Sequence, residues 1–181
     1  MLEDILIPFF TIALAEIGDK TQLAVLTLSS RTNEHGKLLL GVMAAFVLST
    51  ALAVIFGDLI SLYVPIVYVK IIAGLAFIYF GITTFLNHEK EAAVELKDPF
   101  TSAFTLVFIS EMGDKTQLGA ALFATRFNPI FVFIGSVAAL FVLSAAAIYV
   151  GKFLATKINR KLISQAGAIL FVILGLGFIF L

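Results

Sequence analysis

Two short stretches of this chain place acidic, basic and amide side chains inside segments that are otherwise apolar. Residues 16–23 read Glu-Ile-Gly-Asp-Lys-Thr-Gln-Leu, and residues 111–118 repeat this stretch 95 positions later with Met in place of Ile. Carboxylate and amide oxygens are ligands that hard cations such as Ca²⁺, Mg²⁺ and Mn²⁺ prefer. Ionisable groups in a membrane-embedded segment are costly unless they face a partner or a cavity. The repeated motif therefore indicates a cation site to which both halves of the chain contribute.

The candidate cation ligands are the carboxylates and amides of the two copies: Glu16, Asp19, Gln22, Glu111, Asp114 and Gln117. Residues three and four positions apart share one face of a continuous helix, so each copy is expected to present its three ligands together. The supporting residues are the glycines, lysines and threonines of the motif: Gly18, Lys20, Thr21, Gly113, Lys115 and Thr116. We expect the glycines to allow close helix approach, or to loosen the helix and free backbone carbonyls.

The formal charge of the two copies is not balanced. Four carboxylates carry −4 and two lysines carry +2, which leaves −2. One divalent cation would neutralise this charge, and so would two protons. Carboxylates that share a low-dielectric site hold protons when no metal is bound. Competition between a divalent metal and protons for the same carboxylates is the physical basis of antiport.

Other interpretations of these residues stay open from the sequence alone. The glutamate and lysine of each copy have the i,i+4 spacing of a helical ion pair, so each motif could simply join helices. The motif threonines could bond the backbone of their own helix instead of a metal. Ser49 and Ser144, which occupy matching places 95 residues apart, could be interhelical hydrogen bonders or could line the ion path.

Composition places the chain in a membrane. Of its 181 residues, 61% are hydrophobic and 13% are charged, and the mean hydropathy is +1.09. A soluble domain is about a quarter charged, so this excess of apolar residues does not fit one soluble core. A net charge of zero offers no basic surface for nucleic acid. The lack of cysteine excludes disulfides and thiolate metal sites, and the acidic N-terminus, unlike a signal or transit peptide, favours a prokaryotic cell membrane.

The apolar segments predict an all-α integral membrane protein. A spanning helix needs about 20 mostly apolar residues, and six segments qualify: 5–29, 38–63, 67–87, 100–125, 130–153 and 161–181. The first three-helix repeat is residues 1–87, a polar linker covers 88–99, and the second repeat is 100–181. Because each repeat has an odd number of helices, the second enters the membrane from the opposite side, and the two repeats are inverted.

The basic residues near the predicted helix ends indicate the orientation. Lys70 and Arg126 fall on one side, and eight residues fall on the other: Arg31, Lys37, Lys90, Lys97, Lys152, Lys157, Arg160 and Lys161. Loops rich in Lys and Arg are cytoplasmic in multi-pass proteins. We therefore expect a multi-pass protein of the cell (inner) membrane, with a cytoplasmic linker and with both termini outside.

With these residues placed, the chain resembles the Gdt family of membrane cation exchangers, which includes Golgi, chloroplast and bacterial manganese and calcium transporters. The family signature is Glu-x-Gly-Asp-(Lys/Arg)-(Thr/Ser) in two inverted three-helix repeats, and it stands here at residues 16–21 and 111–116. The resemblance implies export of Mn²⁺ or Ca²⁺ from the cytosol against protons, with the motif carboxylates as ligands. It implies a transporter with no cofactor rather than an enzyme. Its partners are then the cation, protons and the bilayer, and the oligomeric state, a homodimer included, stays open.

Two functions of other classes compete with this expectation. An intramembrane aspartyl protease also needs two buried aspartates, but the Gly-x-Gly-Asp form is missing, and hydrolysis does not require the repeated glutamates and lysines. An exporter of small cationic organic solutes would need a roomier site. The sequence does not choose between Mn²⁺ and Ca²⁺, because both are hard cations that the same oxygen ligands suit.

Overall fold

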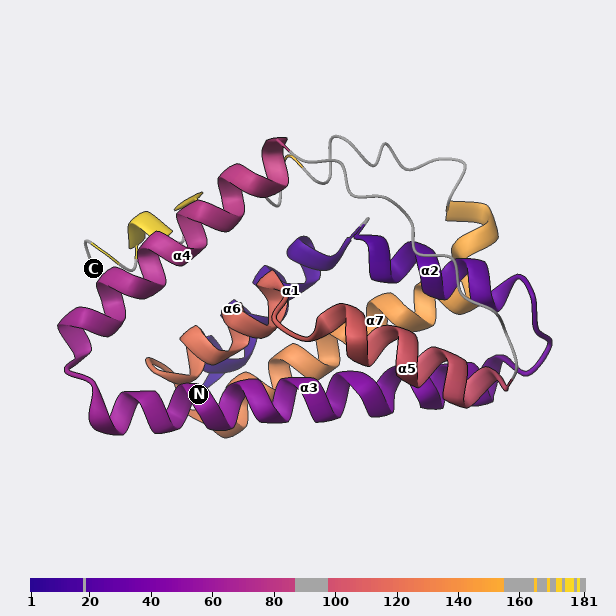
Figure 1. The fold of residues 1–181 in the computed structure, drawn as a ribbon, viewed down its shortest axis with the longest axis horizontal. Helices are drawn as coiled ribbons and strands as arrows, with labels where there is room; N and C mark the ends of the chain where they lie inside the picture. The colour runs from indigo at the N-terminus through magenta and orange to yellow at the C-terminus, as the bar shows by residue number, and fades with distance from the viewer. Residues whose placement is uncertain are drawn as a thin grey trace.

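Helices are the only regular elements in the part of the chain that the structure, a computed structural model, describes. That part comprises residues 1–17, 19–86 and 98–154, with residues 165, 169, 172–173, 175–177 and 179. Gly18, residues 87–97 and most of the predicted span 161–181 lie outside it, as does the side chain of Lys20. The described helices, drawn in Figure 1, are α1 (Leu2–Glu16), α2 (Lys20–Ser29), α3 (His35–Tyr63), α4 (Ile66–Leu86), α5 (Pro99–Glu111), α6 (Lys115–Ala124) and α7 (Pro129–Leu154).

The structure agrees with the predicted segments that lack the motif and differs from those that contain it. Helices α3, α4 and α7 match the predicted segments 38–63, 67–87 and 130–153 to within three residues at either end. The prediction of single helices over 5–29 and 100–125 is wrong, because each of these segments is divided in two at its motif. The apolar runs continue through both motifs, so hydropathy alone could not locate the breaks.

The two halves of the chain pack reciprocally. Helix α3 lies against α5 and α6 of the second half, and α7 lies against α1 and α2 of the first half. Helix α1 also contacts α6, and α2 contacts α5. Helix α4 leans away from this bundle, as Figure 1 shows, and reaches it where the ring centroid of Phe77 lies 5.7 Å from that of Phe123 in α6. Each half therefore completes its core with helices of the other half.

Glycines set how closely these helices approach. Gly41 of α3 lies so near the backbone carbonyl of Phe100 in α5 that a side chain would not fit, and Gly135 of α7 meets the carbonyl of Ile5 in α1 in the same way. Ile5 and Phe100 occupy matching places, 95 residues apart. The backbones touch at both contacts, as is common where small residues line helix interfaces in membranes.

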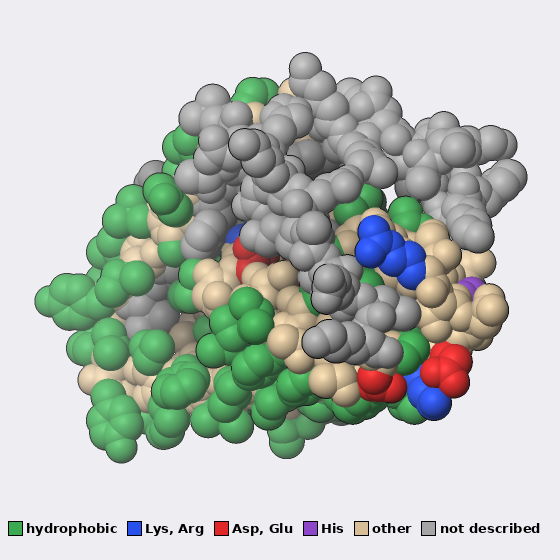
Figure 2. Space-filling view, turned by 45° about the vertical axis from the view of Figure 1, so that its right-hand side comes forward, with side chains coloured by type: hydrophobic (Ala, Val, Ile, Leu, Met, Phe, Trp, Pro, Cys, Tyr) green, Lys and Arg blue, Asp and Glu red, His purple; other side chains and the backbone are tan. Residues whose placement is uncertain are grey.

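The outer surface is largely apolar. Helices α3 and α7 each contain a stretch long and apolar enough to cross a membrane, His35–Ile60 and Pro129–Tyr149, and these are the two such stretches in the described residues. Large side chains such as Phe56, Ile72 and Ile134 are exposed on the helices. Figure 2 shows hydrophobic side chains over much of the visible face, with most of the visible charged side chains gathered at one end. This distribution suits a protein whose sides face lipid.

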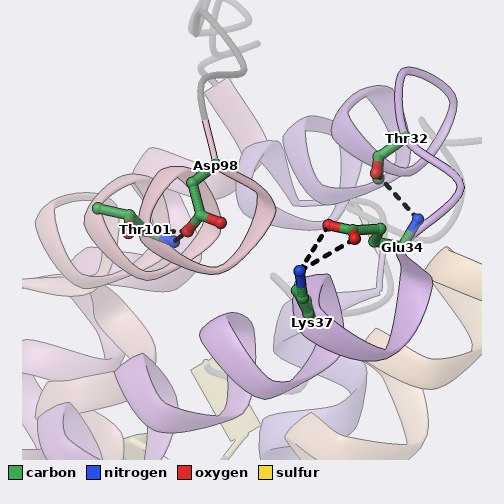
Figure 3. Close-up of polar contacts among 5 residues, drawn as sticks. All are labelled: Thr32, Glu34, Lys37, Asp98 and Thr101. Atoms are coloured by element: carbon green, nitrogen blue, oxygen red, sulfur yellow. Dashed lines mark hydrogen bonds and ion pairs between the residues drawn. The ribbon is translucent and has the colours of Figure 1, made fainter.

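The charged end contains the starts of α3 and α5, which lie near each other (Figure 3). Glu34 pairs with Lys37 at 2.9 Å, and its backbone N–H donates to the Thr32 hydroxyl. At the start of α5, the Asp98 carboxylate accepts from the backbone N–H and the hydroxyl of Thr101, and these hydrogen bonds hold the pKa of Asp98 below its usual value. The loop before α3 and the end of the linker before α5 thus meet at one end of the bundle.

Candidate cation site

Both motifs interrupt their helices, and the described residues on either side of the motif glycine have nearly the same backbone conformation in the two copies. Helix α1 ends at Glu16 and α5 at Glu111, and the next residues, Ile17 and Met112, are extended with φ/ψ of −61°/116° and −63°/108°. Asp19 and Asp114 then begin the following helices with φ/ψ of −71°/161° and −73°/165°. The expectation that each copy shares one continuous helix face is therefore wrong.

Glycine permits the break in the second motif. Gly113 has a φ of +80°, in the left-handed region that other residues rarely adopt, and a Cβ added to it would meet nothing within 4 Å. The helix is broken at this glycine, which agrees with the expected loosening, and the open space beside it shows no close approach of another helix. Gly18, its counterpart, lies outside the described residues. The backbone N–H of Asp114 donates to the Glu111 carbonyl at 3.1 Å, and Asp19 repeats this bond to Glu16 at 3.0 Å.

The breaks bring three predicted ligands together. One carboxylate oxygen each of Glu16, Asp19 and Glu111 lies within 4.8 Å of the others. The two glutamates are 0% and 2% exposed. Each ends a helix, where the negative end of the helix dipole disfavours another negative charge. Asp114 is near enough to interact electrostatically with both glutamates. A cation at this place would offset several buried negative charges at once.

The aspartates that begin α2 and α6 do not cap these helices. An Asp at this position usually accepts from a backbone N–H of the first turn, but neither Asp19 nor Asp114 does so. Instead, the Asp19 carboxylate pairs with the Lys115 ammonium of the other half at 2.6 Å, and the two side chains are 8% and 11% exposed. The alternative that Lys115 pairs with Glu111 along its own helix is therefore wrong.

The threonine of the second motif also reaches across. The Thr116 hydroxyl donates to the Glu16 carboxylate, so the expectation that it bonds its own helix is wrong. Thr21 lies close to the Glu111 carboxylate in the matching arrangement, but its buried hydroxyl has no partner with hydrogen-bond geometry. Each motif threonine faces the glutamate of the other motif. This arrangement could not be derived from the spacing within one motif. Its signal lay in the repeat itself, because residues of the two copies come together in one cluster.

The two motif amides have different surroundings. Gln117 accepts from the backbone N–H of Gly113 at 2.7 Å and donates to the Ser49 carbonyl of α3 at 3.1 Å. Gln22 is 7% exposed, and neither atom of its amide has a partner. The Ser49 hydroxyl bonds the Phe46 carbonyl on its own helix, whereas the buried hydroxyl of Ser144 has no partner. The role of the Ser49 carbonyl could not be predicted from the sequence, because a backbone acceptor has no side-chain signature.

Several buried oxygens are left as available acceptors. They are Glu16 Oε2, Asp19 Oδ2, Glu111 Oε1 and Gln22 Oε1, none of which has a hydrogen-bond partner. A buried carboxylate oxygen without a donor is costly. A hard cation would satisfy all of these atoms and protons would satisfy the carboxylate oxygens, so the donor set fits the predicted chemistry. With Lys115 included, the three clustered carboxylates carry a formal charge of −2.

Comparison with known proteins gives a consistent result over most of the chain. The family model described as "Divalent cation/proton antiporter GDT1" matches residues 4–92 and 99–180. A protein of Vibrio cholerae named "Putative manganese exporter" is 28% identical over 92% of this chain and 85% of its own length. A GDT1-like protein 1, chloroplastic, of Oryza sativa subsp. japonica is 26% identical over 91% of this chain, which spans 58% of that relative.

A shorter match covers part of the chain only. GDT1-like protein 4 of Arabidopsis thaliana is 39% identical over 77 residues, which are 42% of this chain and 34% of the relative. No solved structure matches the chain.

Proposed function

Because the chain belongs to the GDT1 family of divalent cation/proton antiporters, we propose that it exports Mn²⁺, Ca²⁺ or both from the cytosol in exchange for protons. The family is one of transporters, so the alternative of an intramembrane protease is wrong. The relative named as a manganese exporter supports Mn²⁺ as a substrate. Calcium stays in the proposal because the oxygen ligands suit both ions.

The observation that carries the proposal is the buried carboxylate cluster built by both halves. Glu16 and Asp19 come from the first half and Glu111 from the second, and each retains an oxygen without a hydrogen-bond partner. We assign these three residues as cation ligands, with Asp114 beside them and Gln22 able to add an amide oxygen. Gln117 was expected to be a ligand, but its amide already bonds Gly113 and the Ser49 carbonyl.

Proton coupling follows from the charge of the same cluster. A divalent cation neutralises a formal charge of −2, and two protons do the same. The carboxylates can therefore hold either the cation or the protons, because holding both would leave excess charge in a low dielectric. Metal binding then releases protons, and protonation on the other side of the membrane releases the metal. The exchange needs no chemistry beyond these acid–base steps.

Alternating access is proposed to use the two repeats, residues 1–87 and 100–181, as inverted units of a six-span, multi-pass protein. Discontinuous helices that meet at a central ion site are typical of such transporters. The reciprocal packing of α3 on α5 and of α7 on α1 supports this arrangement. The start of α3, with Lys37, lies near Asp98 at one end of the bundle, which supports placing the loop before α3 and the linker on the same side, and we propose that this side is cytoplasmic.

The test is metal-driven proton movement in proteoliposomes with an internal pH dye. We expect Mn²⁺ or Ca²⁺ added on one side to change the internal pH, and Na⁺ or K⁺ at equal ionic strength to do nothing. Binding of these cations should also raise the unfolding temperature in detergent, whereas cationic amino acids should not, which separates the proposal from an exporter of organic solutes. Metal uptake without any pH change would contradict the proton coupling.

A further inference from the structure

Gln22 and Gln117 stand at matching positions of the two motifs but differ in their hydrogen bonding. Gln117 connects the break of the second motif to the middle of α3, because its amide oxygen accepts from Gly113 and its amide nitrogen donates to the Ser49 carbonyl. These two hydrogen bonds tie a left-handed backbone turn to a long helix of the other half. We name this connection the Gln117 clamp.

The matching connection in the first half is not made. Gln22 lies in α2, which packs against α7, as α6 packs against α3. Ser144 of α7 stands at the position that Ser49 occupies in α3. Both atoms of the Gln22 amide and the hydroxyl of Ser144 are buried without a partner. A buried amide that makes no hydrogen bond is costly, whereas the same amide in a clamp would be satisfied.

We propose that the two glutamines form alternating clamps, with the Gln117 clamp closed and the Gln22 clamp open in this structure, and that transport exchanges the two states. In the other state Gln22 bonds α7 near Ser144, and Gln117 releases α3. In the clamps the glutamines are positioning residues that set which motif is held against the opposite half, and Gln22 can offer its amide oxygen to the cation only in the state in which its clamp is open. This inference rests on the proposed transport function, and it concerns how the site is presented rather than which ion it binds.

The proposal predicts opposite effects for two matched variants. Gln117→Met and Gln22→Met keep the side-chain length and remove the amide. The apparent affinity depends on the population of the binding-competent state. Gln117→Met should therefore raise the apparent KM for Mn²⁺ on one side of the membrane and lower it on the other. Gln22→Met should do the reverse. The expected shift is about tenfold, the order that the loss of one or two hydrogen bonds gives.

The double variant and a surface control complete the test. Because the two shifts oppose each other, Gln22→Met with Gln117→Met should return the KM on both sides toward the native value. Thr27→Ala should change neither, since Thr27 is exposed on α2 and bonds only the Leu23 carbonyl of its own helix. If both glutamine variants weaken affinity equally on both sides, the glutamines are ligands and the clamps do not alternate.

A cross-linking measurement in detergent is independent of transport. The chain has no native cysteine, so Gln22→Cys with Ser144→Cys and Gln117→Cys with Ser49→Cys give clean pairs for a bifunctional thiol reagent as long as a glutamine side chain. The 22/144 pair should cross-link faster when Gln117→Met is added, and the 49/117 pair when Gln22→Met is added. A 22/144 pair that never reacts would overturn the clamp model. Absent metal exchange in the native protein would instead overturn the proposed function.

Discussion

In the first half of the molecule Gln22 is buried without a partner, whereas in the second half the same residue type, Gln117, bonds both its own loop and α3. The described backbone on either side of the two motif glycines is nearly identical, with extended residues at 17 and 112 and helix starts at 20 and 115. The break is thus a property of the repeated sequence, while the side-chain bonding depends on how the halves are placed against each other.

The same contrast runs through the cross-half contacts. Thr116 donates to Glu16, whereas Thr21 lies near Glu111 without a bond of proper geometry. An exchanger built from two equivalent units must adopt unlike arrangements of them in turn, because a symmetric arrangement would face both sides equally. Substitutions at matching positions of the two motifs distinguish the places where the halves are equivalent from those where they differ.

The largest effect is expected from the glutamates. Glu16→Gln and Glu111→Gln keep the side-chain volume but remove one negative charge, so a divalent cation no longer balances the cluster. Loss of a residue that only hydrogen-bonds a metal ligand typically lowers metal affinity or activity roughly 10–100-fold. Loss of a ligand itself should lower metal-driven proton movement by more than this. The pH dye in proteoliposomes measures this, and the loss should be similar for the two variants. Normal exchange in either variant would show that the halves do not share one site.

Removing the Lys115 ammonium should be the next largest change. Lys115→Met leaves the buried Asp19 carboxylate without its partner, which typically destabilises a protein by about 3–5 kcal/mol. The site also becomes more negative, so Mn²⁺ should bind more tightly and leave more slowly. We expect a lower unfolding temperature without metal, recovery with metal, and slower exchange. A variant with weaker metal binding would mean that Lys115 holds the carboxylates in place rather than competing with the cation. Lys20→Met is the counterpart in the first half, and we expect the same change in metal binding and release.

Gly113 tests the backbone break itself. Gly113→Ala should cost about 1–2 kcal/mol of stability because its φ of +80° disfavours a Cβ, although the Cβ meets no neighbour. Gly113→Asn should cost less, since Asn tolerates the left-handed region better. Thermal unfolding in detergent measures both. Equal losses for Ala and Asn would point to crowding rather than backbone conformation as the reason for glycine.

Substitution of the two motif threonines should have unequal effects in the two halves. Thr116→Val removes the donor to the buried Glu16 carboxylate and should cost about 1–3 kcal/mol of stability, together with roughly tenfold in metal affinity. Thr21→Val should change both quantities less, because that hydroxyl makes no hydrogen bond in this state. Calorimetric metal binding and thermal unfolding compare the two. Equal losses would indicate that both threonines bond the opposite glutamate when metal is present.

The smallest effect concerns the end of the bundle. Asp98 has a pKa below its ordinary value because the backbone N–H and hydroxyl of Thr101 donate to it. A lowered pKa in the folded state means that the contribution to stability is present above the ordinary carboxyl pKa, near 4, and is lost as the pH falls through the folded value. Asp98→Ala should therefore be less stable than the native protein near neutral pH, and the difference should shrink below about pH 4.

The sequence by itself determined the helical class, the bounds of α3, α4 and α7 and the identity of the polar motif, because apolar runs and a repeated signature are local properties of the chain. It also identified Glu16, Asp19 and Glu111, which do come together. Tertiary structure alone decided that Lys115 pairs with Asp19 and that Thr116 bonds Glu16. Partners about 100 residues apart meet only when the two halves pack reciprocally. The bond from Gln117 to the Ser49 carbonyl also lay beyond the sequence, because it depends on which helix the fold places beside the motif. The one difference within the two motifs, Met112 in place of Ile17, adds a sulfur 3.9 Å from the Gln117 amide nitrogen.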